Sequence, residues 1–169
     1  MRLKRVSWRD VERMCGELAG RIGESGFKPD LILGVGRGGW VPARLLSDLM
    51  GAGRLLSVRV EFYTGVGRTA RVPVVTQSIP KRAFAGRRVL VVDDVADTGS
   101  SLSLIKKMLS GAGEVRVATL HFKPRSRIKP DFFAKTTSAW LVYPWEKHET
   151  MRELGRKRAA KTFKQAACK

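Results

Sequence analysis

Apolar residues along this chain occur either in short runs or at helical spacing. The runs predict five strands, at residues 31–35, 55–62, 72–76, 89–92 and 115–121. The run at 89–92 contains no polar residue, which is typical of a strand buried on both faces of a parallel sheet. Helical spacing predicts helices from about residue 8 to 25, after residue 39 and after residue 101. This alternation favours an α/β fold with a mostly parallel open sheet flanked by helices.

Local signals mark the two ends of the first helix. Ser7 and Asp10 have the spacing of a capping box, which satisfies backbone N–H groups at a helix N-terminus. Gly26 and Pro29 end the helical pattern. The apolar face predicted for this helix consists of Val11, Met14, Leu18 and Ile22.

Length and composition indicate one globular domain. A chain of 169 residues is large enough for one hydrophobic core and too small for two full ones. It contains no apolar run of membrane-spanning length, and its first residues do not form a signal sequence. Cys15 and Cys168 lie near opposite ends without metal-ligand spacing, which favours free thiols. We therefore expect a cytoplasmic protein that does not associate with membranes.

The charge is strongly positive and unevenly distributed. There are 33 Lys and Arg residues against 15 Asp and Glu, a formal net charge of +18. This balance favours polyanionic partners, either phosphorylated metabolites or nucleic acid. Residues 147–169 form a weakly amphipathic basic tail. We expect this tail to pack against the domain or an oligomer partner, and RNA contact is the less favoured alternative.

The densest chemistry follows the apolar run at 89–92. Asp93, Asp94 and Asp97 come first, and residues 98–101, Thr-Gly-Ser-Ser, then open a helical pattern. A glycine-containing loop at a helix N-terminus directs N–H groups toward a phosphate, and the hydroxyls add donors. The carboxylates would repel a bare anion, so the ligand should carry hydroxyls or a bound cation on their side. A sugar phosphate with Mg²⁺ meets both demands.

Three alternatives remain open for these motifs. An apolar strand that ends in Asp-Asp also fits a Walker-B-type Mg²⁺ site, although the chain contains no G-x-x-x-x-G-K-[ST] motif. The same stretch could be a structural junction with a capping Asp. Gly34, Gly36 and Gly39 have dinucleotide-binding spacing, with Glu61 at the end of a later strand. The dinucleotide alternative leaves the three acids and the hydroxyls after residue 92 without a function.

Residues 89–101, Val-Leu-Val-Val-Asp-Asp-Val-Ala-Asp-Thr-Gly-Ser-Ser, resemble the phosphoribosyl-pyrophosphate motif of the type I phosphoribosyltransferases. The resemblance implies that Asp93 and Asp94 hold the ribose hydroxyls and Mg²⁺, directly or through metal-bound water. It implies that Asp97 is the general base. The implied 5′-phosphate site consists of Asp97, Thr98, Gly99, Ser100 and Ser101.

A second stretch, Leu-Gly-Val-Gly-Arg-Gly-Gly at residues 33–39, is similar to the pyrophosphate loop of purine phosphoribosyltransferases. The residues that would bind pyrophosphate are Gly36, Arg37, Gly38 and Gly39. In that family the loop often contains a non-proline cis peptide, which here would join Gly36 and Arg37. The family also has a mobile flap, which would correspond to residues 63–71 with Tyr63, Arg68 and Arg71. An ordinary solvated hairpin loop is the alternative, and no role is assigned to these residues.

The resemblance extends to the residues that would select the base. Lys123 precedes a proline, and a matching Lys in 6-oxopurine phosphoribosyltransferases donates to the purine O6; the alternative is a solvated surface Lys. Trp140 would stack on the purine, or else pack in the core. The backbone of Leu141 and Val142 would read the base edge. The bacterial xanthine-guanine enzyme has an acid where this chain has Val142, so the group expected to bind the guanine amino function is missing.

Together these similarities imply a purine salvage phosphoribosyltransferase that uses phosphoribosyl pyrophosphate, Mg²⁺ and a 6-oxopurine: hypoxanthine, guanine or xanthine. The implied fold is a single domain with a core at about 27–122 and a hood at 1–26 and 123–146, followed by the tail. A homo-oligomer, dimer or tetramer, is expected. The competing hypothesis is a nucleotide-sensing, RNA-binding regulator on the same fold.

Overall fold

The computed structural model of this chain describes residues 3–64, 71–153 and 155. These residues form two compact units. The smaller unit contains the described residues up to Asp10 and those from Ala139 onward, and the larger unit contains residues 11–138. The hood boundaries expected from the sequence, 1–26 and 123–146, stay a prediction. Within the described part of the chain, no helix is long and apolar enough to cross a membrane.

The secondary structure alternates as the apolar pattern predicts. The helices are α1 (Trp8–Glu24), α2 (Trp40–Leu49) and α3 (Ser100–Met108), with two 3₁₀ turns, η1 (Lys81–Ala83) and η2 (Pro144–Glu146). The strands are β1 (Leu3–Arg5), β2 (Leu31–Gly36), β3 (Leu55–Thr64), β4 (Arg71–Gln77), β5 (Arg88–Ala96), β6 (Glu114–Phe122), β7 (Phe132–Thr136) and β8 (Trp140–Val142).

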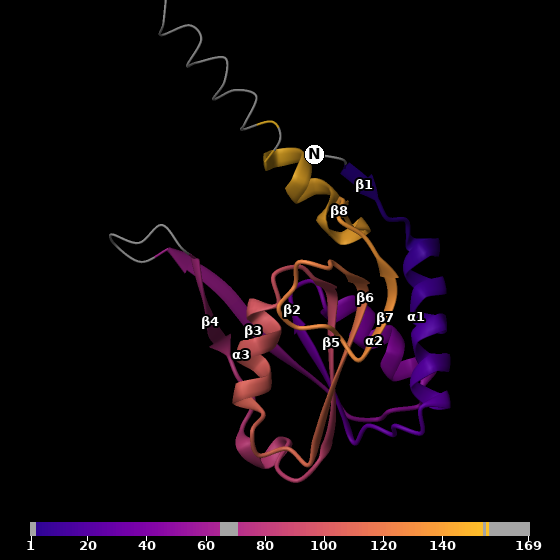
Figure 1. Cartoon of the computed structure of the whole chain (residues 1–169), viewed down its shortest axis with the longest axis vertical. Coiled ribbons are helices and arrows are strands. Elements are labelled where there is room, and N and C mark those ends of the chain that lie inside the picture. The colour runs from indigo at the N-terminus through magenta and orange to yellow at the C-terminus, as the bar shows by residue number, and fades with distance from the viewer. Residues whose placement is uncertain (1–2, 65–70, 154, 156–169) are drawn as a thin grey trace, which may run out of the picture. The chain divides into compact units, whose positions relative to one another are not determined.

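The larger unit is built on a six-stranded sheet with the order β4-β3-β2-β5-β6-β7. All neighbouring strands are parallel except β3 and β4, which form an antiparallel pair at one edge. Figure 1 shows α3 on one side of this sheet and α1 and α2 on the other. The predicted α/β fold with a mostly parallel open sheet is therefore confirmed.

Alternate residues of β2 show how the two helical layers are held. Leu31 and Leu33 belong to the core cluster that also contains Ile105 of α3. Gly34 points the other way, where a Cβ would lie 3.0 Å from the Cβ of Ala43 in α2. Because successive residues of a strand point to opposite faces, a strand with no polar alternation serves both layers.

The apolar stripe of α1 is buried as predicted, and Ser7 caps the helix. The Asp10 N–H donates to the Ser7 Oγ at 3.1 Å, and the Ser7 N–H donates back to Asp10 Oδ2 at 3.1 Å. This reciprocal pair satisfies two backbone donors at the start of the helix. Cys15 lies in the same buried stripe, and burial raises the pKa of its thiol to about 12. The thiol is therefore protonated and unreactive at neutral pH.

The connections of the neighbouring strands β2 and β5 leave the sheet on opposite faces, so the topological switch point of the sheet lies between these strands. β2 leads into α2 on one face of the sheet, and β5 leads into α3 on the other. Loops that leave adjacent strands toward opposite faces separate at the carboxyl edge of the sheet. This is where open α/β sheets bind ligands, so the glycine loop after β2 and the loop after β5 meet at the expected position.

Three details differ from the sequence-based expectation. β5 continues to Ala96 instead of ending at residue 92, because Asp93 pairs with Thr119 and Ala96 pairs with Phe122 of β6. The first residue of the expected flap, Tyr63, belongs to β3, and its last residue belongs to β4, while Arg68 lies outside the described residues. β1, β7 and β8 were not predicted as strands, because β1 and β8 are three residues long and β7 shows no alternating pattern.

The smaller unit contains a short parallel pair and an aromatic cluster. β1 pairs with β8, with Leu3 opposite Trp140. The rings of Tyr143 and Trp145 stack with centroids 4.8 Å apart, and Trp8 lies 5.8 Å from Trp145 in a tilted arrangement. These ring contacts add to the packing of the unit, in which Val6, Leu141, Val142 and Tyr143 are buried.

An ion pair ties the starts of β2 and β5 together and gives an acid-stability prediction. Asp30 accepts hydrogen bonds from the Arg88 backbone N–H at 2.9 Å, from Nε at 3.1 Å and from a terminal guanidinium nitrogen at 2.8 Å. The side-chain hydrogen bonds, then the backbone one, lower the pKa of Asp30 to about 2. Its unfolded pKa is about 3.9, so the pair stabilises the fold above about pH 4 and is lost as the pH falls toward 2.

We therefore expect Asp30→Asn to lower the urea midpoint near neutral pH, with a difference from wild type that shrinks between about pH 4 and pH 2. Urea denaturation followed by circular dichroism across this range measures the effect. Asp48→Asn is the control, because it removes an exposed contact of 3.4 Å with Arg44 within α2 and should change the midpoint less. A difference between Asp30→Asn and wild type that does not vary with pH would contradict the prediction.

Candidate active site

The three candidate carboxylates lie at the carboxyl end of β5 and directly after it, at the carboxyl edge of the sheet. Asp93 and Asp94 belong to the strand, and the backbone N–H of Asp94 donates to Asp93 Oδ1 at 2.9 Å. Asp94 is buried, and Asp97 follows the strand with a partly exposed side chain. Because Asp93 and Asp94 belong to a paired strand, their backbone positions are defined before any ligand binds.

The loop that follows is an anion cradle at the start of α3. Gly99 precedes the helix with a φ of 78°, in the left-handed region that glycine adopts without strain. The Ser100 N–H donates to the Thr98 Oγ1 at 3.3 Å, and the Thr98 hydroxyl donates to Ser100 Oγ at 3.1 Å. The first N–H groups of α3 have no partner within the helix, so they can bind a phosphate together with these hydroxyls.

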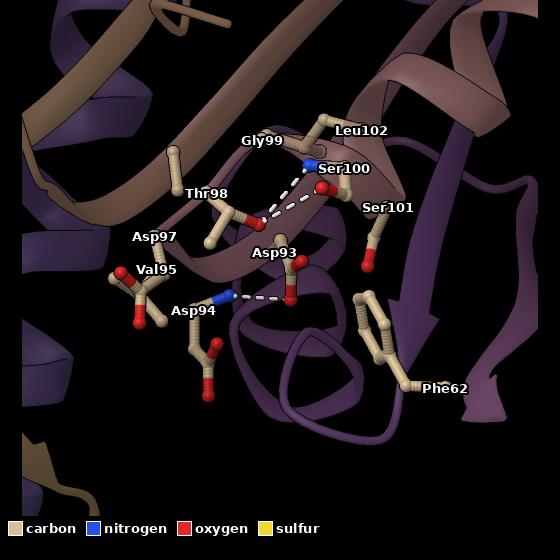
Figure 2. Close-up of a pocket in the computed structure, with 11 residues that line it drawn as sticks. Phe62, Asp93, Asp94, Val95, Asp97, Thr98, Gly99, Ser100, Ser101 and Leu102 are labelled. Carbon is tan, nitrogen blue, oxygen red and sulfur yellow. Dashed lines mark hydrogen bonds between the residues drawn. The ribbon is translucent and has the colours of Figure 1, made fainter. Parts of the chain in front are cut away.

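The acids and the cradle line one cavity of about 450 Å³. Figure 2 shows the carboxylates and hydroxyls around this space, with the ring of Phe62 on the side of Ser101. The lining residues are Phe62, Asp93, Asp94, Val95, Ala96, Asp97, Thr98, Gly99, Ser100, Ser101 and Leu102. A cavity of this size, with acids on one side and hydroxyls on another, is large enough for a sugar phosphate.

The glycine loop after β2 packs directly on the end of β5. A Cβ on Gly38 would lie 2.1 Å from Oδ2 of Asp94, and one on Gly39 would lie 2.3 Å from the Val92 carbonyl oxygen. A side chain at Gly39 would therefore overlap backbone atoms, and one at Gly38 would displace the Asp94 carboxylate. The close approach brings two motifs that are more than fifty residues apart in the sequence into one site.

The loop itself has the conformation that the resemblance implies. The peptide bond between Gly36 and Arg37 is cis. Trp40, the first residue of α2, packs against Gly36, where a Cβ would lie 2.7 Å from the indole Nε1. Arg37 is exposed at the loop and supplies a positive charge beside the glycines.

Lys123 lies at the end of β6 and contacts Asp97. Its side chain is only 6% exposed, and Nζ lies 3.1 Å from Asp97 Oδ2. Arg125 donates to the other oxygen, Oδ1, from Nε at 2.7 Å. Lys123 is therefore not a solvated surface residue, and the structure brings it together with Asp97.

The predicted base-binding residues of the C-terminal part belong to the smaller unit. Trp140, Leu141 and Val142 form β8. Trp140 is 43% exposed, which does not support the core-packing alternative, whereas the side chains of Leu141 and Val142 are buried. The contact of Trp140, Leu141 and Val142 with a purine base stays a prediction.

Two residues of the site were missed by the sequence interpretation. Phe62 lines the cavity from β3, and its place was readable as the last residue of an apolar run before a Gly-rich loop. Arg125 follows a proline in Lys-Pro-Arg-Ser, a turn sequence that could have placed it beside Lys123. Its contact with Asp97 joins residues 28 positions apart, so no local sequence pattern predicts this contact.

The carboxylates at the end of β5 are of the kind that could hold a magnesium ion together with the phosphates of a ligand. Among the described residues there is no group of three His, Cys, Asp or Glu side chains able to hold a metal by themselves. Mg²⁺ is commonly bound by one or two carboxylates, several waters and the phosphates of a substrate. Asp93 and Asp94 supply such carboxylates, with Asp94 next to the glycine loop.

Fold and site together define a class of protein: an α/β protein with neighbouring carboxylates and an anion cradle at the switch point of its mostly parallel sheet. Comparison with known proteins identifies the family. Residues 6–148 match the phosphoribosyl transferase domain. The chain therefore belongs to the phosphoribosyltransferase family.

Relatives in sequence and structure agree with this assignment. The chain is 29% identical over 144 residues to the xanthine-guanine phosphoribosyltransferase of Nitratidesulfovibrio vulgaris, covering 83% of each. A purine phosphoribosyltransferase from Pyrococcus horikoshii matches with a TM-score of 0.75 and 36% identity, over 86% of this chain and 94% of that one. A Neisseria gonorrhoeae protein with bound ppGpp matches with a TM-score of 0.75 and 26% identity, over 91% and 97%.

Proposed function

We propose that this protein is a purine salvage phosphoribosyltransferase that joins a 6-oxopurine to phosphoribosyl pyrophosphate. The observation that carries the proposal is the Lys123–Asp97 pair, with Nζ and Oδ2 3.1 Å apart beside the anion cradle. A 6-oxopurine presents a carbonyl at C6 and an N–H at N7 along one edge. A donor and an acceptor side by side match that edge, and a Lys donor does not match the amino group of adenine.

In this reaction the bond from ribose C1 to pyrophosphate breaks, and its electron pair leaves with pyrophosphate. The purine N9 forms the new bond to C1, and the proton on N7 goes to a base. Asp97 is the proposed base, since its carboxylate lines the cavity beside Lys123. The chemistry depends chiefly on holding the leaving group and on orienting the base over C1.

The remaining residues bind the phosphoribosyl pyrophosphate. The 5′-phosphate is bound by the cradle of Thr98, Gly99, Ser100 and Ser101 at the N-terminus of α3. The pyrophosphate lies on the loop of Gly36, Arg37, Gly38 and Gly39, where backbone N–H groups and one guanidinium offset its charge. Binding energy from these remote groups positions C1 for attack.

Mg²⁺ is the proposed cofactor, and Asp93 and Asp94 are the residues that would hold it and the ribose hydroxyls, directly or through water. When bound, the ion neutralises charge on pyrophosphate. Trp140 is the proposed stacking partner of the base, with the backbone of Leu141 and Val142 at its edge. A homo-oligomer, dimer or tetramer, and a cytoplasmic location complete the proposal.

A base panel tests the proposed function. The protein is incubated with phosphoribosyl pyrophosphate, Mg²⁺ and, in turn, hypoxanthine, guanine, xanthine and adenine, and nucleotide formation is followed by absorbance. We expect turnover of the oxopurines and poor use of adenine. Failure with every oxopurine would overturn the proposal. The RNA-binding regulator receives no support from the relatives, which are named as enzymes of purine metabolism in two of the three cases.

Gly38 provides a prediction about the pyrophosphate loop. In Gly38→Ala the new methyl overlaps the Asp94 carboxylate, which is buried and must move. The displaced Asp94 would lose a charge-assisted hydrogen bond to the ligand, and such a bond contributes about 1.5–3 kcal/mol of binding free energy. We therefore expect the KM for phosphoribosyl pyrophosphate to rise roughly ten- to a hundred-fold. Steady-state kinetics at a saturating concentration of base measures this change.

Gly16→Ala is the control for that variant. Gly16 lies within α1, and a Cβ there would have nothing within 4 Å. Ala is favoured over Gly in a helix by about 0.5–1 kcal/mol, so this variant should be slightly more stable and kinetically unchanged. An unaltered KM in Gly38→Ala would show that the Asp94–Gly38 contact is unimportant for binding.

A further inference from the structure

Arg125 has no place in the roles proposed above, yet it makes a well-defined contact with the proposed base. Its Nε donates to Asp97 Oδ1 at 2.7 Å, and a terminal guanidinium nitrogen donates to the same oxygen. Lys123 Nζ donates to Oδ2 at 3.1 Å. The two oxygens of one carboxylate are thus assigned to two different cations.

A tight turn places both cations. Pro124 follows Lys123, and the Ser126 N–H donates to the Lys123 carbonyl at 2.9 Å, which closes a turn over residues 123–126. Pro is favoured at the second position of such turns because its φ is already suitable. Since the turn separates Lys123 and Arg125 by one rigid residue, their side chains can reach opposite oxygens of Asp97.

Backbone hydrogen bonds anchor this turn on both sides of Asp97. The Lys123 N–H donates to the carbonyl of Ala96 at 3.0 Å, and the Arg127 N–H donates to the carbonyl of Thr98 at 3.0 Å. Ala96 and Thr98 are the immediate neighbours of Asp97 in the sequence. The segment that carries the two cations is therefore fixed relative to the carboxylate, independently of the side-chain contacts.

Exposure separates the two cations. The side chain of Lys123 is 6% exposed, whereas that of Arg125 is 64% exposed. Exposed ion pairs generally add little to stability, so the contact of Arg125 is not needed to hold the fold. Charge-assisted hydrogen bonds from two nitrogens of a planar guanidinium are directional, however, and they restrict the rotation of the carboxylate that accepts them.

We propose that Arg125 is a positioning residue for phosphoribosyl transfer: it holds Oδ1 of Asp97 so that Oδ2 is the oxygen presented to the purine. The inference rests on the proposed function. When the base binds, Lys123 Nζ turns from Oδ2 to the C6 carbonyl, and Oδ2 accepts the N7 proton. The N–H electron pair stays in the purine ring, the proton bonds to Oδ2, and Arg125 remains on Oδ1. Arg125 itself does not contact the purine in this arrangement.

Steady-state kinetics of Arg125 variants tests the proposal. A small misplacement of a reacting group can cost about a hundred-fold in rate, so we expect Arg125→Ala to lower kcat roughly ten- to a hundred-fold. The KM for phosphoribosyl pyrophosphate should stay within about two-fold of the wild-type value, because Arg125 makes no proposed contact with this substrate. Arg125→Lys keeps the charge with a single donor group and should restore part of the lost kcat.

Arg44→Ala is the matched control. Arg44 contacts Asp48 at 3.4 Å on α2, and its side chain has the same exposed fraction as that of Arg125, 64%. Removing this cation changes the net charge equally and should leave kcat and both KM values unchanged. Melting temperatures of all variants are measured by circular dichroism, and we expect them to lie close to that of wild type.

A double-mutant cycle shows whether Arg125 acts through Asp97. In the Asp97→Asn background no proton acceptor remains to be oriented, so adding Arg125→Ala should change kcat by less than about two-fold. Multiplicative losses in the double variant would overturn the proposal, because Arg125 would then act independently of Asp97.

The outcomes separate this inference from the proposed function. A wild-type enzyme inactive on every oxopurine overturns the proposed function and the inference with it. An active wild type whose Arg125→Ala variant has normal kcat overturns the inference alone. A large fall in melting temperature in both Arg125→Ala and Arg125→Lys also overturns it, because Arg125 would then be a stabilising residue.

Discussion

Asp97→Asn should lower kcat by about 10²–10⁴-fold, the usual contribution of a general base. Asn keeps the size of the side chain and one acceptor oxygen, but it cannot take the N7 proton. The amide also lacks the negative charge that Lys123 and Arg125 contact. Rapid-quench measurement of a single turnover, with excess enzyme over base, reports the chemical step directly.

Binding of phosphoribosyl pyrophosphate should be nearly intact in this variant, because the cradle hydroxyls and the glycine loop are untouched. Isothermal titration calorimetry with Mg²⁺ and phosphoribosyl pyrophosphate measures this affinity. Asp48→Asn, on the exposed surface of α2, serves as the control and should retain wild-type kcat. A wild-type rate in Asp97→Asn would remove Asp97 from the mechanism.

Lys123→Ala should reduce kcat/KM for the base roughly ten- to a hundred-fold. A hydrogen bond from a charged donor is worth about 1.5–3 kcal/mol, and the C6 carbonyl of the purine loses such a donor. Because the Lys123 side chain is buried against Asp97, its removal also leaves that carboxylate with one cation fewer. The KM for phosphoribosyl pyrophosphate should change little, since that ligand lies over the cradle.

The same experiment tests base selection. We expect wild type to prefer 6-oxopurines over adenine and Lys123→Ala to lose most of that preference, measured as a ratio of kcat/KM values. Val142 cannot accept a hydrogen bond by its side chain, so hypoxanthine should compete with guanine. Lys107→Ala, at an exposed position in the last turn of α3, is the control. Efficient adenine turnover by wild type, or unaltered kinetics in Lys123→Ala, would contradict the assignment.

Local patterns were sufficient for most of the secondary structure. The apolar runs at 31–35 and 115–121 correspond to β2 and β6, and the stripe starting at Val11 is the buried face of α1. These predictions succeeded because side-chain periodicity reports which faces of an element are buried. They failed where burial depends on partners, as in β7, which lies at the sheet edge with only partly buried residues.

By itself the sequence determined the chemical parts of the candidate site. The stretch from Asp93 to Ser101 and the loop from Gly36 to Gly39 combine residue types that suit a phosphorylated sugar, and both lie within the region that matches the family. The order of strands and helices also predicted the α/β fold, because parallel strands require crossover helices.

Only the tertiary structure decided how these parts meet. Three features of the site join segments that are far apart in the sequence. They are the close approach of Gly38 to Asp94, the position of Phe62 at the cavity, and the hydrogen bonds from Arg125 to Asp97. Such contacts follow from strand order and register, which bring β2, β5 and β6 side by side. Residue periodicity shows which face of one element is buried, but it does not specify which side chain of a neighbouring element lies against that face. These contacts are therefore set only in the folded chain.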